Sequence, residues 1–174
     1  MKRNWLGLLL GAVLSIGAPF ANAAPVALPN GSWETFLWAD LGPIDDPADG
    51  YTLIVPVGAT ATIRVVDRLL IGDRYEVFVD GISTLVTSDI NVALDGTDTG
   101  ISDPDAAWAS ADLSKGSLVL GAGSYDIDID VFRVNSVLDS GGAFIRADVV
   151  PEPATLALLG LGLAGLGLRK RASA

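Results

Sequence analysis

Three carboxylates, Asp126, Asp128 and Asp130, alternate with apolar residues in the last third of the chain. In a β-strand, all three would share one face, with successive α-carbons about 6.6–6.8 Å apart. Carboxyl pairs at comparable separations serve glycoside hydrolysis. A regular acidic row on the solvated face of a strand needs no catalytic purpose, and nothing marks one of these acids as buried. We therefore expect a protein that is not an enzyme, with a polysaccharide-active enzyme as the alternative.

The chain contains neither cysteine nor histidine. Their absence excludes disulfides, thiolate nucleophiles, zinc and haem sites, and every catalytic triad that needs an imidazole base. Most hydrolase chemistry is excluded with them. We expect no cofactor, apart from the calcium alternative that follows.

Aspartates crowd two loops in a way that could suit calcium, which takes six to eight oxygen ligands. The first loop contains Asp45, Asp46 and Asp49, and the second contains Asp95, Asp98, Asp103 and Asp105. Neither loop has the spacing of an EF-hand, and Asp with Gly and Pro is ordinary turn chemistry. Calcium therefore stays open as an alternative to a domain without a metal.

Trp33, Trp38 and Trp108 are candidates for binding a sugar. An exposed indole can stack on a sugar ring while its N–H finds a polar partner. Tryptophan is mostly buried on average, so packing in the core is the alternative for each of the three.

The centre of the chain is strongly acidic. Residues 24–150 contain 20 acidic and six basic residues, a formal charge of −14. Such a polyanion is repelled by nucleic acid phosphates, whose binding needs clustered Lys and Arg. Nucleic acid is therefore excluded as a partner. Any bound glycan is expected to be neutral, or anionic with calcium as a bridge.

The same central region has the alternating pattern of β-strands, broken by Gly, Asp and Pro. Eight such runs are Trp33–Trp38, Tyr51–Val55, Ala61–Val66, Tyr75–Val79, Thr84–Thr87, Ser117–Leu120, Tyr125–Val131 and Ala143–Val149. Without a long helix, they predict an all-β fold, a single antiparallel β-sandwich over roughly Ser32–Val149. The predicted core includes Val77, Val79, Leu118, Ile127 and Ile129.

The N-terminus has the three parts of a signal peptide. Lys2 and Arg3 precede the apolar run Trp5–Ile16, and small residues Ala21 and Ala23 follow. We expect residues 1–23 to form a signal-peptide helix that signal peptidase removes after Ala23. A retained anchor is disfavoured, because the run is shorter than the ~20 residues of a membrane span.

The C-terminus also has three parts: Pro151-Glu152-Pro153, the uncharged run Ala154–Leu168, and Arg169-Lys170-Arg171. A helix over 154–168 would reach about 22 Å, short of a ~30 Å hydrocarbon core. Local thinning of the bilayer and snorkelling of the basic side chains can close that gap. The basic cluster 169–171 would lie on the cytoplasmic side and the central domain outside.

These parts, in this order, resemble the PEP-CTERM sorting signal of Gram-negative bacteria over about the last 22 residues. The resemblance implies that residues 151–174 are a sorting tail with a transmembrane helix, processed by an exosortase. It implies an exported, inner-membrane-anchored precursor that then reaches the cell surface or extracellular matrix, associated with exopolysaccharide and biofilm. Exopolysaccharide and neighbouring surface proteins are the expected partners, and an ordinary tail anchor is the alternative.

A second resemblance concerns the central domain. Gly72–Val77 and Gly121–Ile127 resemble the strand entries of jelly-roll-like domains that often precede such tails. A jelly-roll-like sandwich over residues 24–150, between two terminal helices, is therefore expected.

Overall fold

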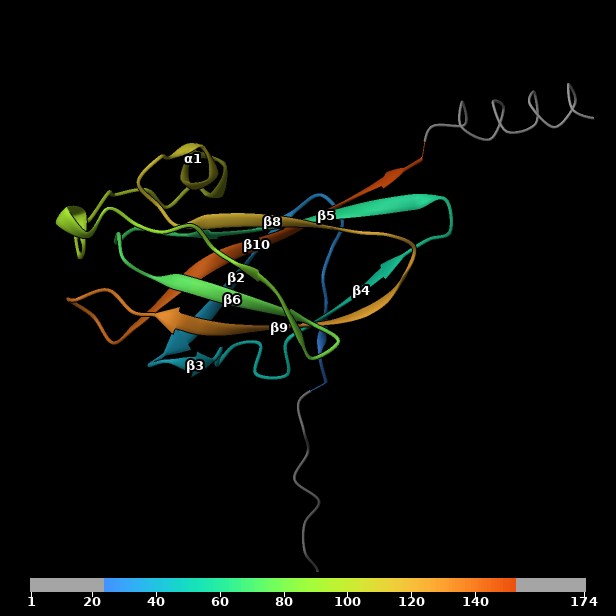
Figure 1. The fold of residues 1–174 in the computed structure, drawn as a ribbon, viewed down its shortest axis with the longest axis horizontal. Helices are drawn as coiled ribbons and strands as arrows, with labels where there is room; N and C mark the ends of the chain where they lie inside the picture. The colour runs from blue at the N-terminus through green and yellow to red at the C-terminus, as the bar shows by residue number, and fades with distance from the viewer. Residues whose placement is uncertain (1–23, 153–174) are drawn as a thin grey trace, which may run out of the picture.

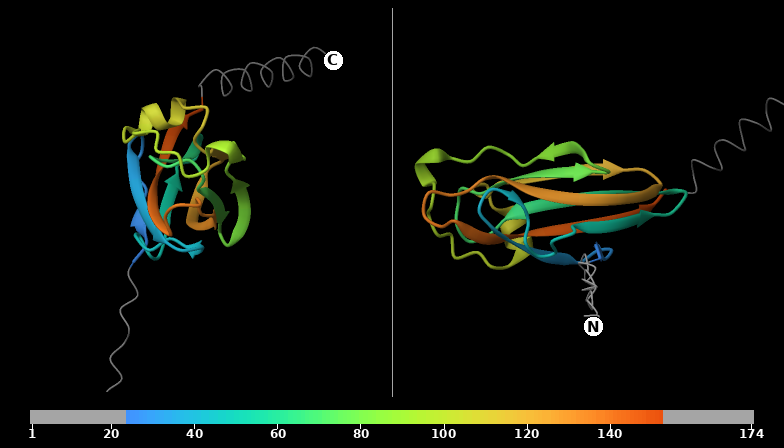
Figure 2. Two further views of the ribbon diagram at one scale, coloured as in Figure 1. Left: turned by 90° about the vertical axis from the view of Figure 1, so that its left-hand side faces the viewer. Right: turned by 90° about the horizontal axis from the view of Figure 1, so that it is seen from below.

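Alternating apolar and polar residues give each strand one apolar face, and two sheets bury these apolar faces by packing against each other. The computed structural model describes residues 24–152 and shows this arrangement (Figure 1; Figure 2). The predicted antiparallel β-sandwich is thus confirmed in its main features. The expected signal-peptide helix (1–23) and sorting helix (154–168) lie outside the described residues. Within 24–152, no helix is long and apolar enough to cross a membrane.

One sheet has six strands. Its order is β1 (Val26–Ala27), β4 (Tyr51–Val55), β9 (Gly123–Arg133), β6 (Arg74–Val79) and β7 (Ile82–Val86), and β3 (Gly42–Pro43) also pairs with β9. The pair β1–β4 is parallel and the remaining pairs are antiparallel. Strand β9 is the centre of this sheet, because it pairs with β3, β4 and β6.

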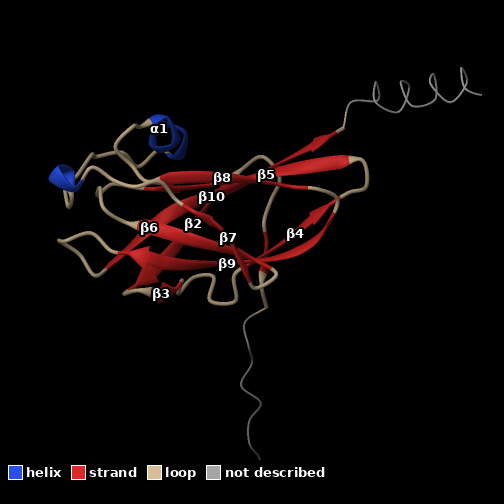
Figure 3. Ribbon diagram, in the orientation of Figure 1, coloured by secondary structure: helices blue, strands red, loops and turns tan. Residues whose placement is uncertain are grey.

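The second sheet has four antiparallel strands. Its order is β2 (Trp33–Ala39), β10 (Ser140–Pro151), β5 (Ala59–Asp67) and β8 (Lys115–Leu120). The described helices are short: η1, a 3-10 turn at Val92–Leu94, and α1 at Pro104–Ala109 (Figure 3). Both belong to the long connection between β7 and β8.

All eight predicted strands overlap an observed strand, and Tyr51–Val55 matches β4 at both ends. Strand β7 begins and ends earlier than the predicted Thr84–Thr87. The shift arises from the hairpin turn at Asp80 and Gly81, both with positive φ, which lets pairing with β6 start at Ile82.

Apolar side chains from both inner faces form the main core. The five predicted core residues are buried, with exposed fractions from 0% for Val77 to 9% for Leu118. Each such side chain contributes about 1.5–3 kcal/mol when removed from water. A second apolar cluster (Val66, Ile71, Ala107, Leu113 and Phe144) forms where α1 covers the other face of the four-stranded sheet.

Helix α1 has local signals that explain its position. Asp103 precedes it and accepts a 2.8 Å hydrogen bond from the backbone N–H of Ala106, and Pro104 occupies the first helical position. An N-cap aspartate followed by proline is a typical helix start. Ala107 then anchors the helix on the sheet with its fully buried side chain.

Candidate functional site

Trp38 lies in the main core. It is 2% exposed and belongs to the same apolar cluster as Phe36 and Tyr75. Its indole is therefore inaccessible to a ligand. Trp38 packs in the core, and the prediction that it could contact a glycan is wrong. Trp33, five residues earlier on β2, points to the opposite face of the sheet because side chains alternate along a strand.

Trp33 and Trp108 meet on the outer face of the four-stranded sheet. Their ring centroids lie 6.1 Å apart with planes tilted by 44°, and both residues are half-buried. Trp33 also contacts Phe144 edge to face at 6.5 Å. Strand β2 and helix α1, separated by about 70 positions in sequence, thus form one aromatic surface.

The strand register places two arginines beside these rings. Arg146 of β10 is the cross-strand partner of Trp33 on one side and of Arg64 of β5 on the other. The Arg146 guanidinium lies 5.8 Å from the Trp33 ring centroid, and the Arg64 guanidinium lies 5.5 Å from that of Trp108. Lys115 Nζ approaches the Trp108 centroid at 5.8 Å. Such cation–π contacts are favourable at partly exposed sites.

Asp148 bridges the two facing arginines, and Asp105 links Arg146 to Trp33. Like charges on directly paired strand positions are destabilising. Asp148 offsets this repulsion, since its carboxylate lies 2.8 Å from Arg64 and 2.7 Å from Arg146. Asp105 accepts a 2.8 Å hydrogen bond from Trp33 Nε1 and lies 3.7 Å from Arg146.

We name this set the tryptophan–arginine cluster: Trp33, Arg64, Asp105, Trp108, Arg146 and Asp148. With Lys115 beside Trp108 and Arg68 over the Phe144 ring at 5.5 Å, four of the six basic residues of the central region stack on aromatic rings of this face. This surface combines apolar ring edges with the N–H donors of arginine and lysine side chains, on a domain that is otherwise acidic.

The acidic row of β9 lies on the outer face of the other sheet. Asp128 and Asp130, with Phe78 of β6, line a cavity of about 270 Å³ whose rim includes Pro43 and Ile44. Partial burial raises the pKa of Asp130, and the neighbouring charges of Glu76 and Asp128 add to the effect. Asp126 is not among the lining residues.

In the first calcium candidate loop, Asp45 has a local partner for its carboxylate, which accepts a hydrogen bond from the backbone N–H of Ala39. Asp46 forms a backbone bridge with Leu37 of β2. One carboxylate oxygen of Asp49 is buried without a hydrogen-bond partner among the described residues.

Each acid of the second loop has a partner within the fold. Asp95 pairs with Arg133 at 2.9 Å, Asp98 accepts from Gly100 N at 2.7 Å, and Asp103 caps α1. Asp105 belongs to the tryptophan–arginine cluster. Across residues 24–152, no three acidic side chains are grouped so that they could hold a metal ion. The described geometry therefore gives calcium no support.

The structure also reveals a buried acidic pair that the sequence did not single out. Asp67 is 0% exposed, and its Oδ1 accepts from Arg68 N at 2.8 Å and from the Tyr75 hydroxyl at 3.1 Å. Asp73 is 3% exposed and accepts from Asn135 N at 2.7 Å. Burial raises the pKa of both carboxyls, and the charge of Asp73 raises that of Asp67 further. The one sequence signal for this buried pair is the position of Asp67 at the end of an apolar strand.

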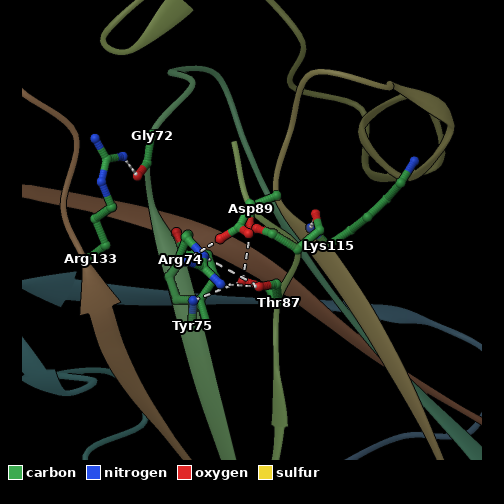
Figure 4. A network of polar contacts seen from close by, with 9 residues as sticks. Gly72, Arg74, Tyr75, Thr87, Asp89, Lys115 and Arg133 are labelled. Carbon is green, nitrogen blue, oxygen red and sulfur yellow. Dashed lines mark hydrogen bonds and ion pairs between the residues drawn. The ribbon is translucent and has the colours of Figure 1, made fainter. Parts of the chain in front are cut away.

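A polar network joins the two sheets at their β7 and β8 edges (Figure 4). Thr87 accepts from Tyr75 N at 3.0 Å and from the Ser114 hydroxyl at 2.6 Å, and its carbonyl accepts from Arg74 at 2.9 Å. Arg74 also pairs with Asp89 at 2.6 Å. These bonds satisfy buried polar groups and hold the long connection after β7, so their role is structural.

The end of β10 leads directly into the predicted sorting tail. Val149, Val150 and Pro151 pair with Ala61–Ala59 of β5, and Glu152 N donates a 2.7 Å hydrogen bond to the carbonyl of Gly58. Pro153 and the basic cluster lie outside the described residues.

Comparison with known families identifies this segment. Residues 149–171 match the PEP-CTERM protein-sorting motif, as the resemblance predicted. The match includes every predicted motif residue: Pro151, Glu152, Pro153, Arg169, Lys170 and Arg171. The motif implies an exported, membrane-sorted protein that an exosortase processes. No curated protein and no solved structure matches the chain. The jelly-roll likeness and cleavage after Ala23 stay predictions.

Proposed function

We propose that this chain is a non-catalytic component of the cell surface or extracellular matrix that binds exopolysaccharide through its tryptophan–arginine cluster. The pairing of Trp33 with Trp108 on an outer sheet face carries the proposal. Half-exposed indoles offer apolar surface to the C–H groups of a sugar ring. An exosortase first processes the inner-membrane-anchored precursor.

The charges beside the rings favour a polysaccharide that bears carboxylate groups. Arg64, Arg146 and Lys115 place three cations next to two carboxylates, so the cluster is locally positive on a strongly acidic domain. Guanidinium groups bind carboxylates with charge-assisted hydrogen bonds. This proposal replaces the expectation from sequence, which was a neutral glycan or an anionic glycan bridged by calcium, with an acidic glycan bound without a metal.

Glycan arrays with residues 24–152 test the proposal. Binding to acidic glycans should fall at least tenfold in Trp33→Ala and in Trp108→Ala. Phe132→Ala is the matched control, because Phe132 is an exposed aromatic under Arg74 on the opposite sheet and should leave binding unchanged. Circular dichroism checks that each variant stays folded.

Two outcomes contradict polysaccharide binding. Equal loss in Phe132→Ala would show that the effect is not specific to the cluster. Capture of surface proteins from matrix extracts, without binding to any glycan, would identify a neighbouring surface protein as the partner.

A secreted polysaccharide-active enzyme is the second candidate, and the cavity beside Asp128 and Asp130 favours it. The pKa of Asp130 is raised next to Asp128. In glycosidases, a raised pKa keeps the general acid protonated beside an ionised partner carboxylate. Polysaccharide turnover that is lost in Asp128→Asn and kept in Asp126→Asn would establish catalysis. We expect no turnover by the unmodified protein.

A further inference from the structure

The sorting tail leaves the sandwich without a linker. Glu152 is still hydrogen-bonded to Gly58, and the apolar run begins at Ala154, only two residues later. Two extended residues span at most about 7 Å. Anchoring of that run in a bilayer therefore brings this end of the sandwich to the membrane surface.

Three segments meet at this end, which we call the tail end. Strand pairing joins Pro151 to Ala59, Ala61 to Leu120 and Val55 to Gly123. The tail end thus consists of residues 55–59, 120–123 and 149–152. Figure 1 shows the β4–β5 and β8–β9 turns on the same side of the sandwich as the red end of β10.

The tail end exposes apolar side chains and few charges. Val57, at the tip of the β4–β5 turn, is 97% exposed. Val150, near the end of β10, is 57% exposed. Glu152 is the acidic residue of these three segments, which contain no Lys or Arg.

The opposite end is acidic. It is formed by residues 68–73, 87–114 and 134–139, which connect strands at the other end of the sandwich. These connections contain eight aspartates: Asp73, Asp89, Asp95, Asp98, Asp103, Asp105, Asp112 and Asp139. Charge is therefore distributed unevenly along the sandwich, with the apolar end beside the tail.

We propose that the tail end is a membrane-contacting surface, with the bilayer that anchors the sorting tail as its occupant. The side chains of Val57 and Val150 enter the headgroup region, where removal of apolar surface from water is favourable. The acidic end points away from anionic lipid, which would repel it. This inference rests on the proposed membrane-anchored precursor, and it adds a fixed orientation of the domain relative to the bilayer.

The test uses the full chain, isolated from a host without an exosortase and reconstituted in phosphatidylcholine vesicles. Because the chain has no cysteine, Val57→Cys and Val150→Cys can each carry one polarity-sensitive fluorophore. Val92→Cys is the matched control, since Val92 is 74% exposed at the acidic end. Both tail-end labels should shift to the blue and be quenched at least threefold more by lipid-borne spin labels than the Val92 label.

The outcomes separate this inference from the proposed sorting. Chain that floats with the vesicles but shows equal quenching at Val57, Val150 and Val92 overturns the membrane-contacting surface alone. Chain that does not float with vesicles refutes the anchored precursor, and the inference is refuted with it.

Discussion

The Tyr75 hydroxyl donates a 3.1 Å hydrogen bond to Asp67 Oδ1 in the fully buried interior between the sheets. The other carboxylate oxygen of Asp67 has no hydrogen-bond partner among the described residues. Burial, and then the charge of Asp73, raises the pKa of Asp67 well above its ordinary value of 3.8. The folded protein therefore holds a proton on Asp67 over a pH range in which the unfolded chain has lost it.

Stability should accordingly depend on pH through Asp67. A carboxyl with a raised pKa in the folded state stabilises the fold fully below its unfolded pKa, and this contribution is lost as pH rises toward the folded value. Asp67→Asn removes this pH dependence, because it replaces the titrating carboxyl with a neutral amide of similar size. We expect the variant to gain on the order of 1 kcal/mol over the unmodified protein at pH 7, with the difference shrinking toward pH 4.

Urea unfolding at several pH values measures that difference. Asp112→Asn is the control, because Asp112 is exposed at the same end of the sandwich and should show no pH-dependent gain. A gain for Asp67→Asn that is constant from pH 4 to pH 7 would contradict a titration of Asp67.

Gly72 should tolerate no side chain. Its φ is +143°, and an added Cβ would lie 2.8 Å from the Asn135 α-carbon and would also clash with Asp95 Oδ1. Backbone strain and overpacking each cost about 1–3 kcal/mol, so Gly72→Ala should destabilise by about 3 kcal/mol or more. Gly31→Ala, at φ +79° with open space around it, should cost only about 1–2 kcal/mol. Similar urea midpoints for the two variants would contradict the close packing at Gly72.

The inner face of β9 should account for much of the stability. Ile127 is 0% exposed between the sheets, so Ile127→Ala should cost about 2–5 kcal/mol through lost burial and a cavity. Ile54, on β4 of the same sheet, is 73% exposed, and Ile54→Ala should change stability by less than about 0.5 kcal/mol. Thermal unfolding compares the two. A larger loss of stability in Ile54→Ala than in Ile127→Ala would contradict burial of the inner face of β9.

The strands and the core were predictable because period-two alternation is a local signal. Tyr125–Val131 predicts both β9 and its buried isoleucines. The same alternation puts Trp33 and Trp38 on opposite faces of β2, but it does not say which face is inward. That depends on the pairing of β2 with β10, more than 100 residues away along the chain.

The tryptophan–arginine cluster could not be predicted for the same reason. Arg64 and Arg146 meet through the register of β5 with β10, and Trp108 joins them only because α1 packs on that sheet. Nor does the sequence reveal which of many aspartates is buried, since an aspartate at the end of an apolar strand, such as Asp67, can face either the core or solvent. The sorting motif was predictable because its three parts are contiguous in sequence.

Processing of the tail is the last prediction, and it follows from the PEP-CTERM match over residues 149–171. In a host with an exosortase, the surface protein should begin at Ala24 and lack the residues beyond the Pro-Glu-Pro region. Glu152→Ala should block loss of the tail, because it changes the motif while keeping the backbone N–H that bonds Gly58. Glu34→Ala, an acidic residue on β2 outside the motif, is the control and should be processed normally. Intact-mass analysis of the surface fraction distinguishes the forms. Persistence of the tail through Arg171 in the unmodified mature protein would refute processing and leave a simple membrane anchor.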